Sequence, residues 1–551
     1  MIKNKRVAFV FLIVILTLLG LQVQGQDYGL EAQHTWGESR YDFAYSLALF
    51  SNDLYLVGFT DSFGRNDAFI TKFSLNPFQV LWSKRFTSTV GSRIFYDVLA
   101  SSTGIYVTGS SYFHPTEQHP ILIKFDSNGN LIWSRYVYFN NIILMRRYEL
   151  GEALAITNFG SLVCISGYIY NDRYDSYGGY FACFDDSGNL NSAYSKFFYY
   201  STVDSGVTFY PYGIASYSSN LFLVGITTSS VIPPFIARYD GTSLIMKSFP
   251  SSVRNITSIA IDNMGNLYIT GQYINNVFLA KISPTLSIIY SKVIQLSGDN
   301  IGNSIVLDSS NNIYIAGRTT LGGNDDVLVI KLDNNGNPIW CKTWGSPGYE
   351  NAHKIRVDSN NELHLAGSSA SIGNSLNDIS CSITNVSVSL SDVPFIYLLS
   401  LYSLTFNPSL TTFSGNLDNP KIIDALYLKI SPIITTTVTT TLTSTITTVV
   451  SDTSTLTSTS TTTITSTLTS TSTITSTITD TLTSTIATST VTIVVTQCSP
   501  LLLRINEIEK VNNVLKETKI INQILYSTLY IFISLTFLFS FMIIKNRKKW
   551  K

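Results

Sequence analysis

The sequence has no surplus of either charge and few charged residues of any kind. Its 551 residues include 36 Lys and Arg against 36 Asp and Glu, so the formal net charge is zero and only 13% of residues are charged. Nucleic-acid binding depends on a basic stripe or patch, and this balance provides no excess of basic residues to build one. We therefore expect no nucleic-acid partner.

Chemically reactive side chains are also scarce. The chain has five His and five Cys. His114 and His119 lie close together in a Pro-containing stretch, but they lack the helical spacing of zinc ligands. The sequence contains no nucleophile elbow, phosphate-binding loop or dinucleotide fingerprint. We predict no catalytic residues, no metal and no cofactor, and expect that the chain is not an enzyme.

A repeat occupies most of the chain. A five-residue phrase with alternating apolar residues and a final glycine recurs roughly every 50 residues, and such a period indicates a repeat architecture. The phrase occupies residues 54–58, 105–109, 163–167, 221–225, 267–271, 313–317 and 363–367.

Each unit contains further short runs rich in Val, Ile, Tyr and Phe. One run ends in Lys or Arg, and the next opens with an aromatic residue before Ser or Cys and a base. Gly, Asn and Asp separate the runs, which is typical of strands joined by hairpins, and four strands make a propeller blade. The sequence therefore predicts an all-β fold, a seven-bladed β-propeller over residues 30–431.

The two ends of the repeat region complement each other. The seventh unit ends at Ile430 without its outer strand, whereas residues 32–37 resemble the outer-strand residues 340–345. We predict that residues 33–36 form the outermost strand of the last blade, because this pairing closes the ring and removes free sheet edges.

These units resemble the bacterial and archaeal β-propeller repeat family of secreted proteins, which combines Trp-Gly, a Tyr-x-x-Gly strand and a Lys-ending strand in each repeat. The resemblance covers the propeller only. It implies the fold and no particular activity, since propellers support many functions.

Residues 368–421 form a long insertion between the second and third strands of blade seven. Insertions in repeat proteins commonly map to loops on one face, and often to the binding face. The alternative is a decorative hairpin or a plug under the ring.

The segments outside the propeller predict export and anchoring. Residues 1–25 read as a signal peptide, with an uncleaved anchor as the alternative. Residues 433–496 are Thr- and Ser-rich and predict a disordered, O-glycosylated stalk. Residues 501–523 fit a short coiled coil that self-associates, or a plain juxtamembrane helix.

Residues 524–544 carry no charge and match the thickness of a bilayer, and the basic tail 545–551 follows them. We expect a single-pass protein of the cell membrane with an extracellular head and a cytoplasmic C-terminus. This order of segments resembles archaeal cell-surface and S-layer-anchoring proteins.

Two cysteines replace repeat residues in the same unit. Cys164 takes the place of the aromatic residue in the repeated phrase, and Cys183 takes the place of the base in the next strand. Counting back from the hairpin places these residues opposite each other, so we predict a disulfide. The alternative is two small buried thiols. Cys341 and Cys381 form a second candidate pair, which leaves Cys498 unpaired.

Two further patterns suggest modification or ion binding. Asn255 and Asn385 begin Asn-x-Ser/Thr sequons and are candidate N-glycosylation sites. Asp-rich turns, such as those at Asp126 and Asp333, have oxygens at alternate positions, but they lack the bidentate acid that calcium prefers. We interpret them as hairpin turns.

We expect a membrane-anchored cell-surface propeller that acts in binding, adhesion or envelope scaffolding, with an unknown glycan or protein ligand at the propeller face. The alternative is an extracellular enzyme, such as a polysaccharide lyase or a quinoprotein-like oxidoreductase. An enzyme requires convergent polar groups in the central funnel.

Overall fold

The computed structural model describes residues 28–432 with short gaps, together with two strands beyond them, β36 (Thr435–Val450) and β37 (Ser454–Thr469). The gaps are residues 38–40, 64–65, 88–90, 115–116, 139–150, 172–175, 201–206, 229–232, 371–374, 394–395, 401, 406–408, 413–415 and 418–423.

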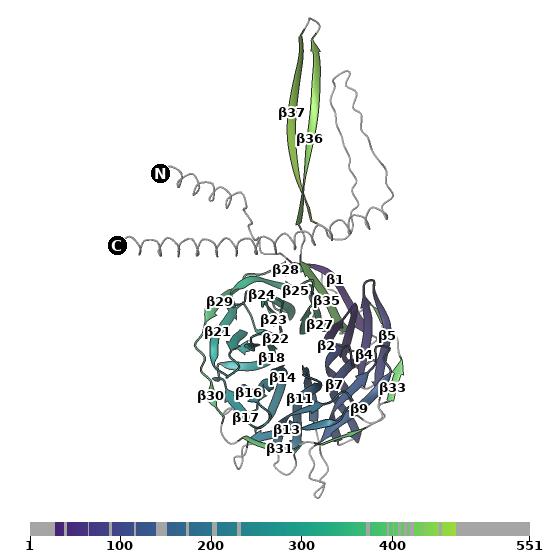
Figure 1. The fold of residues 1–551 in the computed structure, drawn as a ribbon, viewed down its shortest axis with the longest axis vertical. Coiled ribbons are helices and arrows are strands. Elements are labelled where there is room, and N and C mark those ends of the chain that lie inside the picture. Colours follow the sequence, from purple (N-terminus) through teal and green to yellow (C-terminus); the bar gives the residue numbers. More distant parts are fainter. Residues whose placement is uncertain are drawn as a thin grey trace, which may run out of the picture. The chain divides into compact units, whose positions relative to one another are not determined.

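Seven antiparallel sheets of five strands each form the blades of a ring (Figure 1). All elements in the described part of the chain are strands, so the predicted all-β, seven-bladed propeller is confirmed. The seven inner strands are β2 (Asp42–Phe50), β6 (Arg93–Ser101), β10 (Gly151–Phe159), β14 (Phe209–Tyr217), β18 (Val253–Ile261), β22 (Asn300–Leu307) and β26 (Glu350–Val357).

The remaining strands of each blade follow outward from the inner strand. The second strands are β3 (Asp53–Thr60), β7 (Gly104–His114), β11 (Leu162–Asn171), β15 (Asn220–Thr227), β19 (Leu267–Tyr273), β23 (Ile313–Thr319) and β27 (Leu363–Ser369). The third strands are β4 (Asp67–Leu75), β8 (Glu117–Phe125), β12 (Ser176–Phe184), β16 (Phe235–Tyr239), β20 (Asn276–Ile282), β24 (Asp326–Leu332) and β35 (Asp424–Pro432). The fourth strands are β5 (Phe78–Thr87), β9 (Leu131–Tyr138), β13 (Leu190–Tyr200), β17 (Leu244–Ser248), β21 (Ile288–Gln295), β25 (Pro338–Trp344) and β1 (Tyr28–Gly37).

The repeated glycine lies beneath a bulge in the neighbouring inner strand. In blade five the pairing register of β18 and β19 shifts between Ile256 and Ser258, opposite Gly271. A Cβ atom on Gly271 would lie 2.0 Å from the carbonyl oxygen of Asn255, which is far inside van der Waals contact. The same contact recurs at 1.7–2.0 Å in all seven blades, at Gly58, Gly109, Gly167, Gly225, Gly271, Gly317 and Gly367. The repeat therefore requires glycine because the bulged backbone occupies the space of a side chain.

The N-terminal strand closes the ring, as predicted. β1 pairs antiparallel with β35, and Gln33 lies opposite Leu428 while Trp36 lies opposite Ala425. The indole Nε1 of Trp344 in blade six donates to Gln33 Oε1 at 2.9 Å, which ties the closing strand to its neighbour. The last blade thus combines strands from the two ends of the propeller sequence.

The insertion of blade seven forms a belt around the outside of the ring, which we define as residues 376–417. Its seven short strands pair in turn with the fourth strands of blades six, five, four, three, two, one and seven. These strands are β28 (Leu376–Asp378), β29 (Ser382–Asn385), β30 (Ser391–Asp392), β31 (Ile396–Ser400), β32 (Tyr402–Thr405), β33 (Ser409–Thr412) and β34 (Asn416–Leu417). Figure 1 shows β29, β30, β31 and β33 along the outer rim.

Both interpretations of the insertion are therefore wrong, since the belt is neither a loop on one face nor a hairpin or plug under the ring. The physical reason is that each fourth strand would otherwise present unpaired N–H and C=O groups. The belt leaves blade seven after Ser369 and encircles the ring. It then ends beside β1 in the blade from which it started.

Hydrophobic clusters join each blade to the next. Seven such clusters are present among the described residues, and each combines side chains of two neighbouring blades. In one of them, Leu54 and Phe69 of blade one pack with Ala425 and Tyr427 of blade seven. The core is therefore distributed around the ring, and burial holds the blades together while the inner strands remain available to line the centre.

Part of the predicted stalk is paired. β36 and β37 form a regular antiparallel hairpin in which Thr435 lies opposite Thr469. The disordered, O-glycosylated stalk over residues 433–496 stays a prediction, and residues 470–496 lie outside the described part of the chain. The alternating Thr, Val, Ile and Leu of β36 and β37 favour extended strands, and the sequence is nearly self-complementary. An isolated two-stranded sheet is only marginally stable in water.

The remaining predicted segments lie outside the described residues. These are the signal peptide 1–25, the helix 501–523, the membrane span 524–544 and the tail 545–551. The described part of the chain contains no helix with the length and apolarity needed to span a bilayer.

The glycine contact leads to a first prediction. Gly271→Ala should lower the free energy of unfolding by about 3 kcal/mol, because the new methyl group must displace the bulged backbone. Gly160→Ala is the matched control. A Cβ there meets no atom within 4 Å, and its φ of 59° adds only a left-handed backbone cost of about 1 kcal/mol. Denaturant unfolding compares the two, and an equal loss in both would contradict the role of the bulge.

The belt leads to a second prediction. Ser369 pairs with Asp424, so residues 370–423 can be replaced by a short Asn-Gly turn. We expect this variant to fold, to melt at a lower temperature than the parent and to associate as concentration rises, because seven strand edges become free. The control is a Cys341→Ser, Cys381→Ser variant, which keeps the belt. A belt-free protein that stays monomeric with an unchanged melting temperature would contradict this account.

Candidate functional site

The seven inner strands enclose a cavity of about 510 Å³ at the centre of the ring. The bulge described above places one extra residue of each inner strand on the cavity wall. These seven residues are Tyr45, Tyr96, Leu154, Tyr212, Thr257, Asn303 and His353. Three tyrosines and three other polar residues in this ring give the cavity an aromatic and hydrogen-bonding wall.

The residue after each bulge is usually small, and in blades one, five and six its hydroxyl group bonds to the inner strand of the next blade. Blades one, five and six have Ser46, Ser258 and Ser304 at this position. Blade two has Asp97 instead, and blade seven has Lys354. The repeat therefore carries opposite charges at equivalent positions of two blades that are separated only by blade one.

Asp97 is almost completely buried and accepts hydrogen bonds from three blades. Its Oδ1 accepts from Ser46 Oγ at 2.5 Å, and its Oδ2 accepts from the Ile156 backbone N–H at 3.2 Å. Lys354 Nζ lies 3.0 Å from Oδ2. Burial by itself would raise the pKa of Asp97, but attraction to Lys354 and Arg356, together with the Ser46 hydrogen bond, holds it below the usual value. Asp97 is therefore a fixed anion that links blades one, two, three and seven.

Arg356 extends the positive charge along β26. Its guanidinium NH2 lies 3.9 Å from Asp97 Oδ1, beyond hydrogen-bond distance, and its NH1 donates to the Ile355 carbonyl at 3.2 Å. Burial lowers the pKa of both Lys354 and Arg356, and Asp97 opposes this effect. Two cations thus face one carboxylate across this part of the wall.

Glu152 is the second carboxyl group of the cavity. It lies on β10, two residues before the bulge, and accepts from Gln118 Nε2 at 3.1 Å. Burial raises the pKa of Glu152, although hydrogen bonds from Tyr96, Tyr168 and Gln118 partly offset the shift. As pH falls, this carboxyl group therefore becomes protonated at a higher pH than an exposed glutamate does.

Aromatic side chains surround these polar groups. The ring of Tyr45 lies 5.3 Å from those of both Tyr96 and His353, and the rings of Tyr168 and Tyr210 lie 4.7 Å apart. Burial lowers the pKa of His353 to about 4 and raises the pKa of Tyr45 to about 12. At neutral pH these groups are uncharged, so they offer ring faces and hydrogen bonds.

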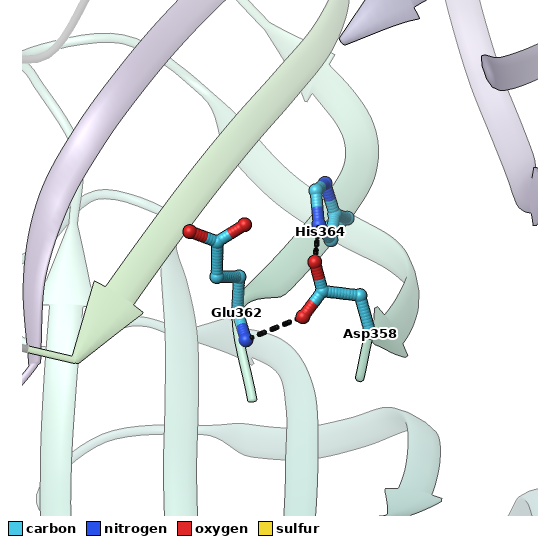
Figure 2. A group of neighbouring side chains, drawn as sticks. All are labelled: Asp358, Glu362 and His364. Atoms are coloured by element: carbon cyan, nitrogen blue, oxygen red, sulfur yellow. Dashed lines mark hydrogen bonds and ion pairs between the residues drawn. The ribbon is translucent and has the colours of Figure 1, made fainter. Parts of the chain in front are cut away.

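A group of possible metal ligands lies outside the cavity, at the turn between β26 and β27. Figure 2 shows Asp358, Glu362 and His364, whose ligand atoms lie within 4.8 Å of one another. One oxygen of Asp358 accepts the Glu362 backbone N–H at 2.8 Å, and the other lies 3.5 Å from His364 Nε2. Lys429 Nζ lies 3.0 Å from Glu362 Oε2. A lysine already supplies the cation here, so the group fits a structural role better than a metal site.

This group is the blade-seven form of a contact found in other blades. In blade five, Lys281 Nζ lies 4.7 Å from the ring centre of Tyr268 and 3.7 Å from Asp262 Oδ2. His364 replaces the tyrosine in blade seven, as its place in the repeated phrase indicates. The aromatic residue and the base of the repeat thus stabilise adjacent strands rather than a ligand.

The Asp-rich turns use their carboxylates internally. Asp126 Oδ1 accepts from the backbone N–H groups of Asn128 and Asn130, and Gly129 adopts a φ of 77°. Asp333 repeats this arrangement with Asn335 and Asn337. The hairpin-turn interpretation is confirmed for both, because these oxygens already accept hydrogen bonds.

Disulfides join both candidate cysteine pairs in the structure. Cys164 lies opposite Cys183 in the pairing of β11 with β12, and their sulfur atoms are 2.01 Å apart. In this blade a covalent bond takes the place of the contact between aromatic residue and base. Cys341 and Cys381 are joined at 1.98 Å and attach the beginning of the belt to blade six. Cys498 lies outside the described residues.

The two sequons occupy different environments. Asn255 lies on the inner strand β18, half-buried, with Nδ2 3.5 Å from Gln272 Oε1. Asn385 is exposed at the end of the belt strand β29. Glycosylation of both remains a prediction, and the exposed Asn385 is the more accessible acceptor.

The cavity residues were not identified from the sequence. The fold places Asp97, Glu152, Lys354 and Arg356 around one cavity although they are up to 259 positions apart in the chain. A signal for two of them was nevertheless present, because Asp97 and Lys354 replace the small residue that follows the bulge in other repeats. This departure from the repeat could be recognised as a site only by knowing which repeat position lies near the centre of the ring.

No family model matches the chain, and no curated protein matches it in sequence. Its fold is similar to Sqt1 from Chaetomium thermophilum, with a TM-score of 0.35 and 10% identity, over 62% of this chain and 83% of that chain. A luciferin-regenerating enzyme gives a TM-score of 0.32 and 11% identity, over 66% of this chain and 97% of that chain. The polysaccharide lyase Uly1 gives a TM-score of 0.35 and 8% identity, over 75% of this chain and 94% of that chain. Likeness at this level carries no argument about function.

Glu152 leads to a prediction about pH. Its pKa in the folded protein is raised, so its contribution to stability is complete below the ordinary glutamate pKa of about 4.3 and is lost as pH rises through the folded value. Glu152→Gln should therefore become more stable relative to the parent as pH increases. Melting temperatures of both proteins from about pH 4 to 8 provide the measurement.

Glu117→Gln is the control for this experiment, since Glu117 is a partly exposed residue at the start of β8 that does not line the cavity. Parallel melting curves for the parent and Glu152→Gln across the whole pH range would contradict the burial argument.

Proposed function

We propose that the protein is a membrane-anchored cell-surface binding protein whose propeller captures a glycan in its central cavity. The observation that carries this proposal is the composition of the cavity wall, which combines tyrosine rings with neutral hydrogen-bonding groups. Sugars offer both apolar ring faces and hydroxyl groups, so such a wall is complementary to them.

The size of the cavity supports a small ligand or the end of a longer chain. Its volume of about 510 Å³ falls within the range of small-molecule sites. The wall comes from seven inner strands that the blades hold in fixed positions, and a preformed site avoids the entropic cost of ordering loops. An adhesion or scaffolding role follows if the glycan belongs to another cell or to the envelope.

The proposed location rests on sequence features. The apolar N-terminal segment supports export, and the uncharged run 524–544 with its basic tail supports a single membrane anchor. The two disulfides favour an oxidising compartment, where such bonds persist.

A glycan array probed with the full-length chain in detergent tests the proposal. We expect saturable binding to a restricted set of glycans. Tyr212→Ala should weaken that binding about tenfold, because removal of a stacking ring costs about 1.4 kcal/mol. Tyr41→Ala is the control, since Tyr41 is an exposed tyrosine that does not line the cavity. Absence of glycan binding, or equal loss in the two variants, would overturn the proposal.

An extracellular enzyme is the second candidate, and the environment of Glu152 favours it. A carboxyl group with a raised pKa, adjacent to tyrosine hydroxyls and in the same cavity as Lys354 and Arg356, has the properties of a general acid or base. Incubating bound glycans with the protein and analysing their length distinguishes the two candidates. Cleavage that Glu152→Gln abolishes would favour the enzyme.

A further inference from the structure

Positive charge is concentrated on one strand of the cavity wall. Lys354 and Arg356 both lie on β26, whereas the two carboxyl groups of the wall, Asp97 and Glu152, lie on β6 and β10. Asp97 Oδ2 lies 3.0 Å from Lys354 Nζ, and its Oδ1 lies 3.9 Å from the Arg356 guanidinium. The formal charges of these four groups cancel, so β26 provides a local cationic site in the cavity.

Arg356 has hydrogen-bond donors that its protein partners do not use. A guanidinium has five N–H donors in a planar fork. Among the described residues, Arg356 donates to the Ile355 carbonyl and contacts Asp97 only at the longer distance of 3.9 Å. About 30% of its side chain is exposed. The unused donors have the geometry that binds a carboxylate through two parallel hydrogen bonds.

Lys354 supports the same site from two residues away. Residues 354 and 356 both line the cavity, whereas Ile355 between them points into the core. Lys354 Nζ uses one donor for Asp97, and the Lys354 side chain is about 20% exposed. A ligand anion near Arg356 would therefore also be attracted by a second cation, and Asp97 holds that cation in place.

The Arg356 backbone lies at a different depth along the channel from the bulge residues of the inner strands. Arg356 follows the bulge residue His353 by three positions, which corresponds to about 10 Å along an extended strand. A ligand of two or more sugar units can therefore present an anionic group to Arg356 while the ring of another unit contacts Tyr45 and Tyr212 at the bulge level.

We propose that the cavity binds acidic saccharides, in which a uronic-acid carboxylate pairs with Arg356 and Lys354 and the ring of another sugar unit of the same chain packs against the tyrosines. This inference rests on the glycan binding proposed above and specifies its chemical class. Asp97 acts as a positioning residue that orients the two cations, and it does not contact the ligand.

Matched pairs of oligosaccharides test the inference with the unmodified full-length chain. Galacturonate, glucuronate and mannuronate tetramers are compared with their carboxyl-reduced counterparts, which keep the same linkages without the charge. We expect at least one uronate tetramer to bind about tenfold or more tightly than its reduced form, because hydrogen bonds to charged groups contribute that much. Its affinity should fall as salt increases, and that of the reduced form should not.

Variants locate the effect within the cavity. Arg356→Gln should reduce uronate affinity to the level of the reduced tetramer, and Arg356→Lys should retain part of the difference. Arg254→Gln is the matched control. Arg254 is exposed on β18, contacts Asn275 and does not line the cavity, so uronate affinity should not change. Melting temperatures show whether each variant remains folded.

Equal affinity for a uronate and its reduced form would overturn the charge recognition and leave glycan binding in place. Binding of none of the three uronates would also overturn it, and the glycan array then decides the broader proposal separately. Preference for uronates that survives in a folded Arg356→Gln protein would place the recognition elsewhere and overturn the assignment to this cavity.

Discussion

The close approach of a bulged inner strand to the repeated glycine is the constraint on which this structure depends. The bulge puts a carbonyl oxygen where a Cβ would otherwise lie, so each repeat must have glycine at that position. The same bulge turns one additional side chain toward the centre of the ring. One backbone feature, repeated seven times, therefore explains both the sequence signature of the blades and the composition of the cavity wall.

Unpaired strand edges impose a second constraint, which acts at the outside of the ring. β1 provides the missing strand of blade seven, and the belt then pairs with part of the fourth strand in every blade. Cys341–Cys381 attaches the belt where it begins, and pairing of β34 with β1 secures it where it ends. The chain thereby encircles its own fold, and no blade can separate without breaking belt contacts.

Departures from the repeat mark the places where individual blades differ in chemistry. Cys164 and Cys183 replace an aromatic residue and a base, and this change was visible because the hairpin register follows from the local sequence. Asp97 and Lys354 replace a small residue in two separate blades, and their contact depends on ring geometry. Both pairs are departures from the repeat. Only Cys164 and Cys183 lie in one hairpin, so only their contact could be found by counting residues along the chain.

The sequence alone determined the strand pattern, the number of blades, the closing strand and the opposition of two cysteines. These follow from local alternation, turn residues and a fixed period, which act over short stretches of chain. Only the tertiary structure decided the path of residues 376–417 and the meeting of Asp97, Lys354 and Arg356 around one cavity. The belt segments have no repeat of their own, because each short strand is specified by the edge it covers. The cavity charges meet because the ring closes, and closure is a property of all seven blades together.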